Sequence, residues 1–319
     1  MEDTQRLMPP EGGWTARSLV SIDDLSLPEV AYILALAEHY AGYLRRGERP
    51  PQRLLGKTQI NLFYEDSTRT NLSFDLAGRK LGADVLNVPV GASSVNKGES
   101  LIDTAQTLAA FGAHAMIVRH KEPRVHEDIA ARVGCPVINA GDGVREHPTQ
   151  ALLDAATIRS AYGEIKGKAI AICGDVRHSR VAGSGALLFK RLGADVRFVG
   201  PADIMPPAEA FAGIPREHSL RSGLQGADIV MALRFQFERM GEKGAEAARG
   251  YFETFGLTHE TLAFARPGAL VMHPGPMNRG VEIDGALADD TERSLILRQV
   301  FYGVATRMAC LDALVTRGL

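Results

Sequence analysis

Residues 57–82, KTQINLFYEDSTRTNLSFDLAGRKLG, place a strand-like run directly before a helix-like one. The run QINLFYE (59–65) is short, apolar and rich in strand-forming residues, whereas TRTNLSFDLAGRKLG (68–82) spaces its apolar residues as a helix does. A second strand-like run, ADVLNV (83–88), follows at once. A strand, a helix and a strand in this order predict a parallel sheet covered by helices.

The same alternation extends in both directions. Ser26, with Glu29 three positions later, forms a capping-box pattern before an apolar run of helical spacing. Further strands are predicted at AMIVRH (115–120), PVINAG (136–141), KAIAICG (168–174), ADVRFVG (194–200), ADIVMAL (227–233) and ALVMHP (269–274), and further helices at SLIDTAQTLAAFG (100–112), DIAARV (128–133) and VAGSGALLFKRLG (181–193).

Two alternating series predict an α/β fold with two domains, each a parallel β-sheet flanked by helices. We expect the first domain to span residues 1–149 and the second to span 150–291, with a C-terminal helix (292–319) packing back on the first domain. In that helix one face carries apolar residues at Ile296, Val300, Val304, Met308, Leu311 and Val315. The Gly- and Ala-rich segment GEKGAEAARG (241–250) is predicted to be a loop.

Bulk properties favour an intracellular protein that acts on small molecules. With 319 residues, of which 45% are apolar, the chain can bury two cores, and its net charge of −2 favours neither nucleic acid nor a membrane surface as partner. Cys135, Cys173 and Cys310 lie far apart and form neither a disulfide framework nor a CxxC pair, which fits a reducing compartment. Neither a signal peptide nor a membrane-spanning run is found, so we expect a cytoplasmic location.

The strongest local chemical signal is FYEDSTRT (63–70), where a strand ends and a helix begins. The unpaired N–H groups of a first helical turn attract an anion. Ser67, Thr68 and Thr70 add hydroxyl donors, and Arg69 adds a guanidinium that matches a phosphate. The alternative is an ordinary Ser/Thr helix cap. This segment therefore predicts a phosphate site without deciding it alone.

Two further motifs place polar side chains at strand ends. Arg119 in VRH (118–120) ends a predicted strand, and His147 in HPTQ (147–150) precedes a proline at a predicted helix start. Open α/β sheets bind ligands at the carboxyl ends of their strands. A histidine in this position can equally be a helix cap or a surface residue. Together with the STRT turn, the two motifs favour a ligand site.

The second domain carries cationic motifs of its own after predicted strands. GDVRHSR (174–180) contains Arg180, and LRFQFER (233–239) contains Arg234 and Gln236. Guanidinium groups at a sheet edge suit carboxylates, although charged loops are often only solvated. HPGPMNRG (273–280) predicts a rigid turn that could aim backbone carbonyls at a substrate, and VGASSVNKGES (90–100) predicts a lid or an intersubunit loop.

Taken together, these motifs resemble those of the aspartate and ornithine transcarbamoylases. STRT, VRH, HPTQALLD, GDVRHSR, LRFQFER and HPGPMNRGVEI occur in that order, and the resemblance covers roughly residues 17 to 319. Ornithine enzymes carry a His-Cys-Leu-Pro turn where this chain has HPGP. They also carry an Asp and a Ser-Met-Gly segment to bind the amino-acid side chain, whereas this chain has Arg234 and Gln236 in LRFQFER. A cationic pocket suits the side-chain carboxylate of aspartate and repels the ammonium of ornithine. The resemblance therefore implies transfer of a carbamoyl group from carbamoyl phosphate to L-aspartate.

The resemblance also implies a role for each site residue. It implies that the first domain binds carbamoyl phosphate and the second binds aspartate, that no metal or organic cofactor takes part, and that Arg69, Thr70, Arg119 and His147 are catalytic. The carbamoyl-phosphate site would comprise Ser67, Thr68, Arg69, Thr70, Arg119, His147, Gln150, Gly275 and Pro276, and the aspartate site would comprise Lys97, Arg180, Arg234 and Gln236.

The loop that contains Ser93 and Lys97 bears on how the chain assembles with other subunits. Ser93 and Lys97 match the family's loop that reaches into a neighbouring subunit's active site, so the resemblance implies a homotrimer with shared sites. Higher assembly with dihydroorotase-like or regulatory chains stays open, and neither nucleic acid nor a membrane is an expected partner. Asn71 departs from the pattern, because many relatives have arginine after STRT.

Three alternatives stay open at this stage. One is a nucleotide-linked oxidoreductase, suggested by AIAICG and the later GSG at 183–185, although these glycines do not form GxGxxG at the strand end. The others are a transcarbamoylase with a different amino-acid acceptor, and a non-catalytic homologue that partners another pathway enzyme. Intact Arg69, Arg119 and His147 disfavour the non-catalytic reading.

Overall fold

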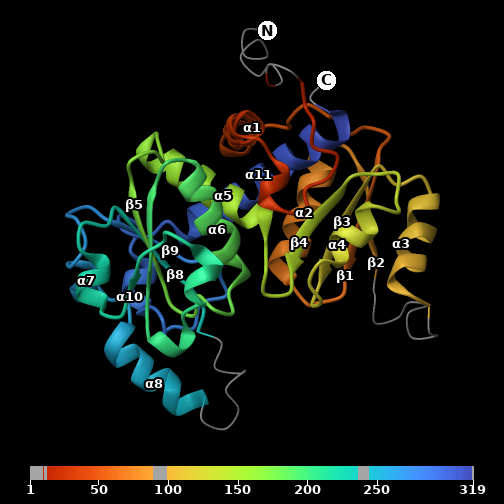
Figure 1. Cartoon of the computed structure of the whole chain (residues 1–319). Helices are drawn as coiled ribbons and strands as arrows, with labels where there is room; N and C mark the ends of the chain where they lie inside the picture. Colours follow the sequence, from red (N-terminus) through yellow and green to blue (C-terminus); the bar gives the residue numbers. More distant parts are fainter. Residues whose placement is uncertain (1–9, 11–12, 89–98, 236–243, 318–319) are drawn as a thin grey trace. The chain divides into compact units, whose positions relative to one another are not determined.

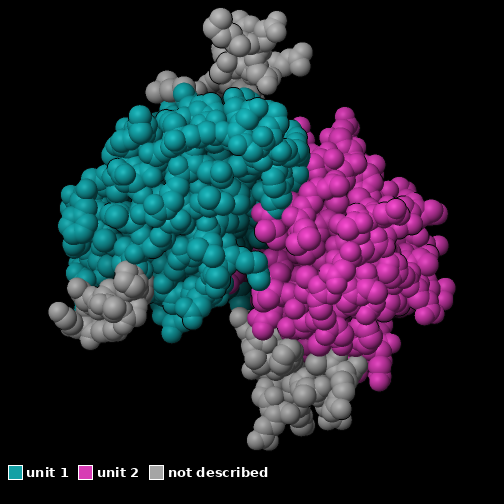
Figure 2. All heavy atoms as spheres, turned by 180° about the vertical axis from the view of Figure 1, so that it is seen from behind, with its two compact units in different colours: residues 1–156, 301–319 teal, residues 157–300 magenta. Residues whose placement is uncertain are grey.

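The chain folds into two compact α/β units. The computed structural model describes residues 10, 13–88, 99–235 and 244–317. Unit 1 comprises residues 1–156 and 301–319, and unit 2 comprises residues 157–300 (Figure 2). Two helices run from one unit into the other, α5 (Pro148–Tyr162) and α11 (Ile296–Thr316).

Unit 1 is built on a four-stranded parallel sheet in the order β2-β1-β3-β4 (Figure 1). The strands predicted from the sequence are confirmed within two residues at each end. β3 and β4 are buried at all six positions because helices cover both faces of the sheet. The strands of unit 1 are β1 (Thr58–Phe63), β2 (Asp84–Val88), β3 (Ala115–His120) and β4 (Val137–Asp142).

The first long helix of unit 1 begins at the predicted capping box. Ser26 accepts a hydrogen bond from the backbone N–H of Glu29, and the Glu29 carboxylate accepts one from the N–H of Ser26 at 2.8 Å. Glu29 also accepts from the backbone of Thr15 and Ala16, so it ties the N-terminal segment to α1. The helices within unit 1 are the 3-10 turn η2 (Ile22–Asp24), α1 (Leu27–Arg45), α2 (Thr68–Lys80), α3 (Leu101–Ala110) and α4 (Val125–Ala130).

The C-terminal helix α11 packs on unit 1, as predicted. Tyr40 of α1 donates a 2.7 Å hydrogen bond from its hydroxyl to Asp312 of α11, and Figure 1 shows the two helices side by side. The predicted apolar face is wrong at Val300, which is 54% exposed, whereas Met308 and Leu311 are fully buried. From Ala305 to Leu314 every residue is buried, because this part of α11 is enclosed on all sides rather than along one stripe.

Unit 2 is built on a five-stranded parallel sheet in the order β7-β6-β5-β8-β9. Its strands are β5 (Ala169–Cys173), β6 (Asp195–Val199), β7 (Arg216–Glu217), β8 (Ile229–Ala232) and β9 (Leu270–Met272). Its helices are α6 (Arg180–Arg191), α7 (Leu220–Leu224), α8 (Gly244–Phe255), α9 (His259–Leu262) and α10 (Gly285–Asp289), with 3-10 turns η5 (Ala202–Ile204) and η6 (Ala208–Phe211). The loop predicted at 241–250 is wrong from Gly244 onward, because alanine, glutamate and arginine favour the helix α8 there.

Each sheet has one point where its strand order reverses. In unit 1 the chain adds β2 on one side of β1 and then β3 and β4 on the other, so the reversal lies between β1 and β3. In unit 2 it lies between β5 and β8, which pair in parallel. Ligands of open α/β sheets bind outside the carboxyl ends of the strands at such a point. Four of the predicted motifs, STRT, VRH, GDVRHSR and LRFQFER, lie at or just after the ends of these four strands, whereas HPTQ follows β4 and HPGP follows β9.

Candidate active site

Arg119 ends β3 at the reversal point of unit 1. Its Nη2 lies 2.7 Å from Oε1 of Glu65, which follows the neighbouring strand β1, and its Nη1 donates to the carbonyl of Ala140 at 3.3 Å. The Arg119 residue is only 8% exposed, whereas the Glu65 side chain is 35% exposed. These contacts hold the guanidinium plane in one orientation at the strand ends, which prepares it for a planar anionic partner.

The STRT turn forms the start of α2 beside this arginine. Ser67 occupies the N-cap position, but its side chain makes no capping hydrogen bond, and its φ of −160° and ψ of 89° are unusual for a cap. The alternative of an ordinary serine cap is therefore wrong. Thr68 and Arg69 are exposed and Thr70 is 8% exposed. The first turn of α2 can present backbone N–H groups and hydroxyls to an anion.

The HPTQ motif forms the start of α5, as predicted. The carbonyl of His147 accepts hydrogen bonds from the N–H groups of Gln150 (2.9 Å) and Ala151 (3.2 Å), and α5 begins at Pro148. The preceding Glu146 is buried and accepts from the Ser21 hydroxyl at 2.6 Å, which anchors this connection. His147 is 4% exposed, so it is not a surface residue.

Gln150 contacts a buried carboxylate one helical turn further along α5. Its Nε2 donates to Oδ1 of Asp154 at 3.0 Å, and Asp154 is fully buried. Unit 1 thus places Glu65, the STRT turn and Arg119 at the carboxyl ends of β1 and β3, and His147 and Gln150 after β4 at the start of α5.

In unit 2, the predicted cations follow the two central strands. After β5, the buried Asp175 accepts hydrogen bonds from the backbone N–H (3.2 Å) and Nδ1 (2.9 Å) of His178, which shapes the turn that leads to α6. Arg180 begins α6 and Arg234 follows β8, and both are partly exposed. Such a pair of guanidinium groups suits a ligand that carries carboxylates.

The HPGP turn of unit 2 is held by a buried histidine and glutamate that sequence reasoning did not single out. His273 Nδ1 accepts from the N–H of Gly275 at 2.8 Å, so the proton of the neutral ring is on Nε2, which donates to Glu282 at 3.0 Å. Glu282 also accepts from the backbone N–H of Asn278 (2.5 Å) and of Phe235 (3.3 Å). The carboxylate thereby joins the turn after β9 to the segment after β8, and the Gly275–Pro276 peptide is cis. The segment HPGPMNRGVEI (273–283) gave no local signal for this contact.

Three predicted residues lie outside the described part of the chain: Ser93, Lys97 and Gln236. The glycines of GSG (183–185) lie inside α6 and are buried, so they pack the helix and do not form a dinucleotide-binding turn. This placement disfavours the oxidoreductase reading. Among the described residues, no helix is long and apolar enough to cross a membrane.

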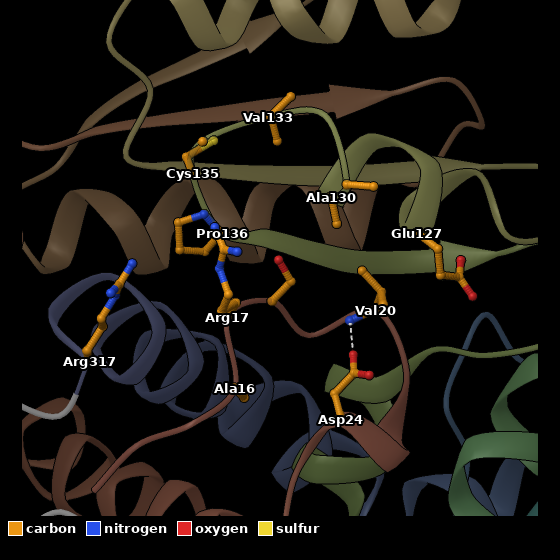
Figure 3. Close-up of a pocket in the computed structure, with 13 residues that line it drawn as sticks. Ala16, Arg17, Val20, Asp24, Glu127, Ala130, Val133, Cys135, Pro136 and Arg317 are labelled. Carbon is orange, nitrogen blue, oxygen red and sulfur yellow. Dashed lines mark hydrogen bonds between the residues drawn. The ribbon is translucent and has the colours of Figure 1, made fainter.

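One cavity in unit 1 lies apart from the predicted site residues (Figure 3). It has a volume of about 410 Å³ and is lined by the N-terminal segment, the α4–β4 connection and Arg317. Its carboxylates are already engaged: Asp24 accepts from the N–H of Val20 at 2.8 Å, and Glu127 pairs with Arg145 at 2.5 Å. None of the residues predicted for substrate binding lines it.

Each of the two α/β units has a parallel sheet with cationic side chains at the carboxyl ends of its central strands, an arrangement that suits small anionic ligands. Comparisons with known proteins agree. Residues 17–160 match the family model "Aspartate/ornithine carbamoyltransferase, carbamoyl-P binding domain", and residues 166–314 match "Aspartate/ornithine carbamoyltransferase, Asp/Orn binding domain". The chain belongs to the aspartate/ornithine carbamoyltransferase family.

Individual relatives lie in the aspartate branch of this family. The chain is 53% identical to the aspartate carbamoyltransferase catalytic subunit of Parvibaculum lavamentivorans, covering 93% of this chain and 91% of that protein. It is also 53% identical to the Rhodospirillum rubrum subunit of the same name, covering 94% of each. The Trypanosoma cruzi aspartate transcarbamoylase in complex with carbamoyl phosphate superposes with a TM-score of 0.87 at 30% identity, covering 98% of this chain and 99% of that chain. These relatives confirm the expected branch.

Proposed function

We propose that this chain is an aspartate carbamoyltransferase, which joins carbamoyl phosphate to L-aspartate and releases N-carbamoyl-L-aspartate and phosphate in the pyrimidine pathway. The observation that carries the proposal is the buried Arg119, held by Glu65 and Ala140 at the reversal point of unit 1. Arg119 lies at the end of β3, next to the strand β1 that leads into the first turn of α2, where the Ser67 side chain makes no capping hydrogen bond. A phosphate with a neighbouring carbonyl is the ligand that such a set of donors suits.

In unit 1, we assign the phosphate of carbamoyl phosphate to the STRT turn. Ser67, Thr68, Arg69 and Thr70 supply hydroxyl, guanidinium and backbone donors, and Arg119 contacts both the phosphate and the carbonyl oxygen. Thr70 and His147 join Arg119 in stabilising the negative charge that develops on that oxygen. Fixed donors are effective here because they need little reorganisation during the reaction.

The carbamoyl amide needs acceptors rather than donors. We assign this role to Gln150 of unit 1 and to the backbone carbonyls of Gly275 and Pro276 in the HPGP turn of unit 2. A histidine–glutamate pair that is buried and hydrogen-bonded holds that turn, which supports a site built from its backbone. We take residues 1–149 with 292–319 as the carbamoyl-phosphate-binding domain and 150–291 as the aspartate-binding domain.

In unit 2, we assign the two carboxylates of aspartate to Arg180, Arg234 and Gln236, with Lys97 contributing from a neighbouring subunit. The amine of aspartate attacks the carbonyl carbon, and the carbon–oxygen bond to phosphate breaks. The departing phosphate keeps the bonding electrons and accepts the proton from the amine. No side chain has to act as the base, so positioning and electrostatic stabilisation supply the rate.

We also propose a cytoplasmic homotrimer whose active sites are shared through the loop that contains Ser93 and Lys97. Leu72 and Leu76, one turn apart on α2, are 62% and 42% exposed, which supports a partner surface on this helix. Three free cysteines, two of them buried, support a reducing compartment. Assembly with dihydroorotase-like or regulatory chains is compatible with this arrangement.

The proposal is tested by binding N-(phosphonacetyl)-L-aspartic acid, the ligand in a Trypanosoma cruzi structure with a TM-score of 0.83 to this chain. This molecule joins a phosphonate to aspartate. We expect calorimetry to show binding tighter than that of carbamoyl phosphate or aspartate alone, because one ligand makes both sets of contacts. Replacing its aspartate part by ornithine should abolish the gain. A ligand with the ornithine part that binds more tightly would favour a different acceptor, and no binding of either would favour a non-catalytic homologue.

A further inference from the structure

Asp154 of α5 is a buried carboxylate, and a buried charge needs hydrogen bonds or a nearby opposite charge to be stable. It is fully buried, and Oδ1 accepts the 3.0 Å hydrogen bond from Nε2 of Gln150. An ionised carboxylate offers only acceptors, so it can face only the NH2 end of the Gln150 amide. The amide carbonyl Oε1 is therefore turned away from Asp154. Four residues separate the two side chains, which places them on one face of α5.

Arg307 of α11 is the cation that accompanies this carboxylate. It is 4% exposed, its guanidinium lies 5.0 Å from the ring centre of Phe74 in α2, and Nη1 donates to the carbonyl of Gly303 at 3.4 Å. Burial lowers the pKa of Arg307 to about 10, and the negative charge of Asp154 opposes that shift. The guanidinium remains charged at neutral pH.

Because Gly303 has no side chain, the Arg307 guanidinium can lie close against the backbone of α11 at this position. A Cβ at this position would lie 3.0 Å from Nη1 of Arg307 and 3.7 Å from Cδ2 of Leu153. The backbone of α11 therefore approaches α5 closely at the level of Asp154. Three elements meet around the buried cation: α2, which carries the STRT turn, α5, which carries Gln150, and α11.

We propose that Asp154, supported by Arg307, is a positioning residue that turns the carbonyl oxygen of Gln150 toward the carbamoyl amide of the substrate. The inference deepens the proposed function and rests on it. An amide side chain that can rotate presents either a donor or an acceptor, and a carbamoyl NH2 needs the acceptor. Asp154 removes the wrong orientation, because a carbonyl oxygen facing its carboxylate is repelled.

The orientation of the Gln150 amide affects only the binding of a ligand that carries a carbamoyl NH2 group. Acetyl phosphate has the same phosphate and carbonyl as carbamoyl phosphate, but a methyl group in place of NH2. Donors in the STRT turn and Arg119 serve both ligands equally. The ratio of the dissociation constants of acetyl phosphate and carbamoyl phosphate therefore reports the acceptor at Gln150 and not the phosphate site.

The test is calorimetric titration of full-length Asp154→Asn with each of the two ligands. An asparagine keeps the volume but can face Gln150 with either end of its amide, so the preferred orientation is lost. We expect carbamoyl phosphate to bind about tenfold more weakly, which corresponds to about 1.4 kcal/mol, and acetyl phosphate to bind as before. Gln150→Met should lower the same ratio, and the double variant should lose no more than the larger single effect, because both changes remove one interaction.

Asp128→Asn is the matched control, because Asp128 is an exposed carboxylate of α4 in the same unit. It should leave both dissociation constants unchanged. An Asp154→Asn protein that binds both ligands with the wild-type ratio overturns the inference, and so does one that loses affinity for both equally, since that indicates a general structural role.

A second variant keeps the inference testable if Asp154→Asn does not fold. Arg307→Met removes the buried cation whose charge supports the Asp154 carboxylate. The preference for carbamoyl phosphate over acetyl phosphate should then fall, whereas Arg307→Lys, which keeps the charge, should keep the preference. An Arg307→Met protein with the wild-type preference contradicts the inference. If wild type binds no carbamoyl phosphate, the proposed function fails instead.

Discussion

Replacing Arg119 by lysine tests the arrangement on which the proposed function depends. The substitution keeps the positive charge but removes the planar fork of donors. In the structure that plane is held by Glu65 at 2.7 Å and by the Ala140 carbonyl at 3.3 Å. A single ammonium on a side chain of shorter overall reach cannot keep both contacts and also reach the phosphate and the carbonyl oxygen of the substrate.

The expected loss follows from the stabilisation of the developing oxyanion. Removing one preorganised donor lowers kcat by about 100- to 1000-fold, which corresponds to roughly 2.7–4 kcal/mol. Because the charge is kept, we expect the KM for carbamoyl phosphate to rise by no more than about tenfold, or about 1.4 kcal/mol. The effect should therefore be larger on kcat than on binding.

Steady-state kinetics at saturating aspartate measure both quantities. Arg132→Lys is the control, because Arg132 lies on the surface, where it pairs with Asp128 at 3.4 Å, and it should have wild-type kinetics. A kcat of Arg119→Lys within fivefold of wild type would refute the role assigned to Arg119. A large loss of kcat accompanied by a lower melting temperature would point to folding, so thermal unfolding is measured on the same samples.

Three further predictions concern stability, acceptor binding and assembly. Burial alone would raise the pKa of Glu29, but hydrogen bonds from Ser26, Thr15 and Ala16 lower it to about 2. A carboxyl with a lowered folded-state pKa stabilises above its unfolded value of 4.5, so Glu29→Gln should unfold in urea with about 3 kcal/mol less stability at pH 7. That difference should shrink as the pH falls from 4.5 to 2, and a difference that is constant with pH would contradict the assignment. Gln236→Ala should raise the KM for aspartate far more than that for carbamoyl phosphate, and equal changes would count against an aspartate site there. Lys97→Ala and Arg69→Ala should each be inactive trimers, and mixing their subunits should restore part of the activity; no recovery in mixed trimers of verified composition would argue against shared sites.

Local sequence patterns predicted the sheets well. Each strand of the two sheets except β7, and the capping box at Ser26 and Glu29, depends on residues that are neighbours in the chain, so pattern and propensity suffice. The same holds for the STRT turn and for His147, whose positions follow from where one strand ends and one helix begins. The strand β7, the helices α7, α8, α9 and α10 and the 3-10 turns η2, η5 and η6 were not predicted, because they are short or, in α8, begin in a glycine-rich segment.

Contacts between distant segments were beyond local reasoning. Gln150 and Asp154 have the i, i+4 spacing of a helical pair, so the sequence contained a signal for their contact. Arg307 lies far from both in the chain, and only the packing of α11 against α5 brings it near Asp154. Likewise, the prediction of one apolar face along α11 is wrong at Val300. The start of the helix is partly exposed, whereas residues 305–314 are buried on all sides, and the sequence alone does not show this change.

The most direct test of the central claim is steady-state carbamoyl transfer by the purified chain, with carbamoyl phosphate and either L-aspartate or L-ornithine and no added metal. We expect N-carbamoyl-L-aspartate and phosphate in equal amounts, with no product from ornithine. Product from ornithine alone would contradict the assignment of Arg234 and Gln236, and the absence of product with either acceptor would contradict the proposed activity.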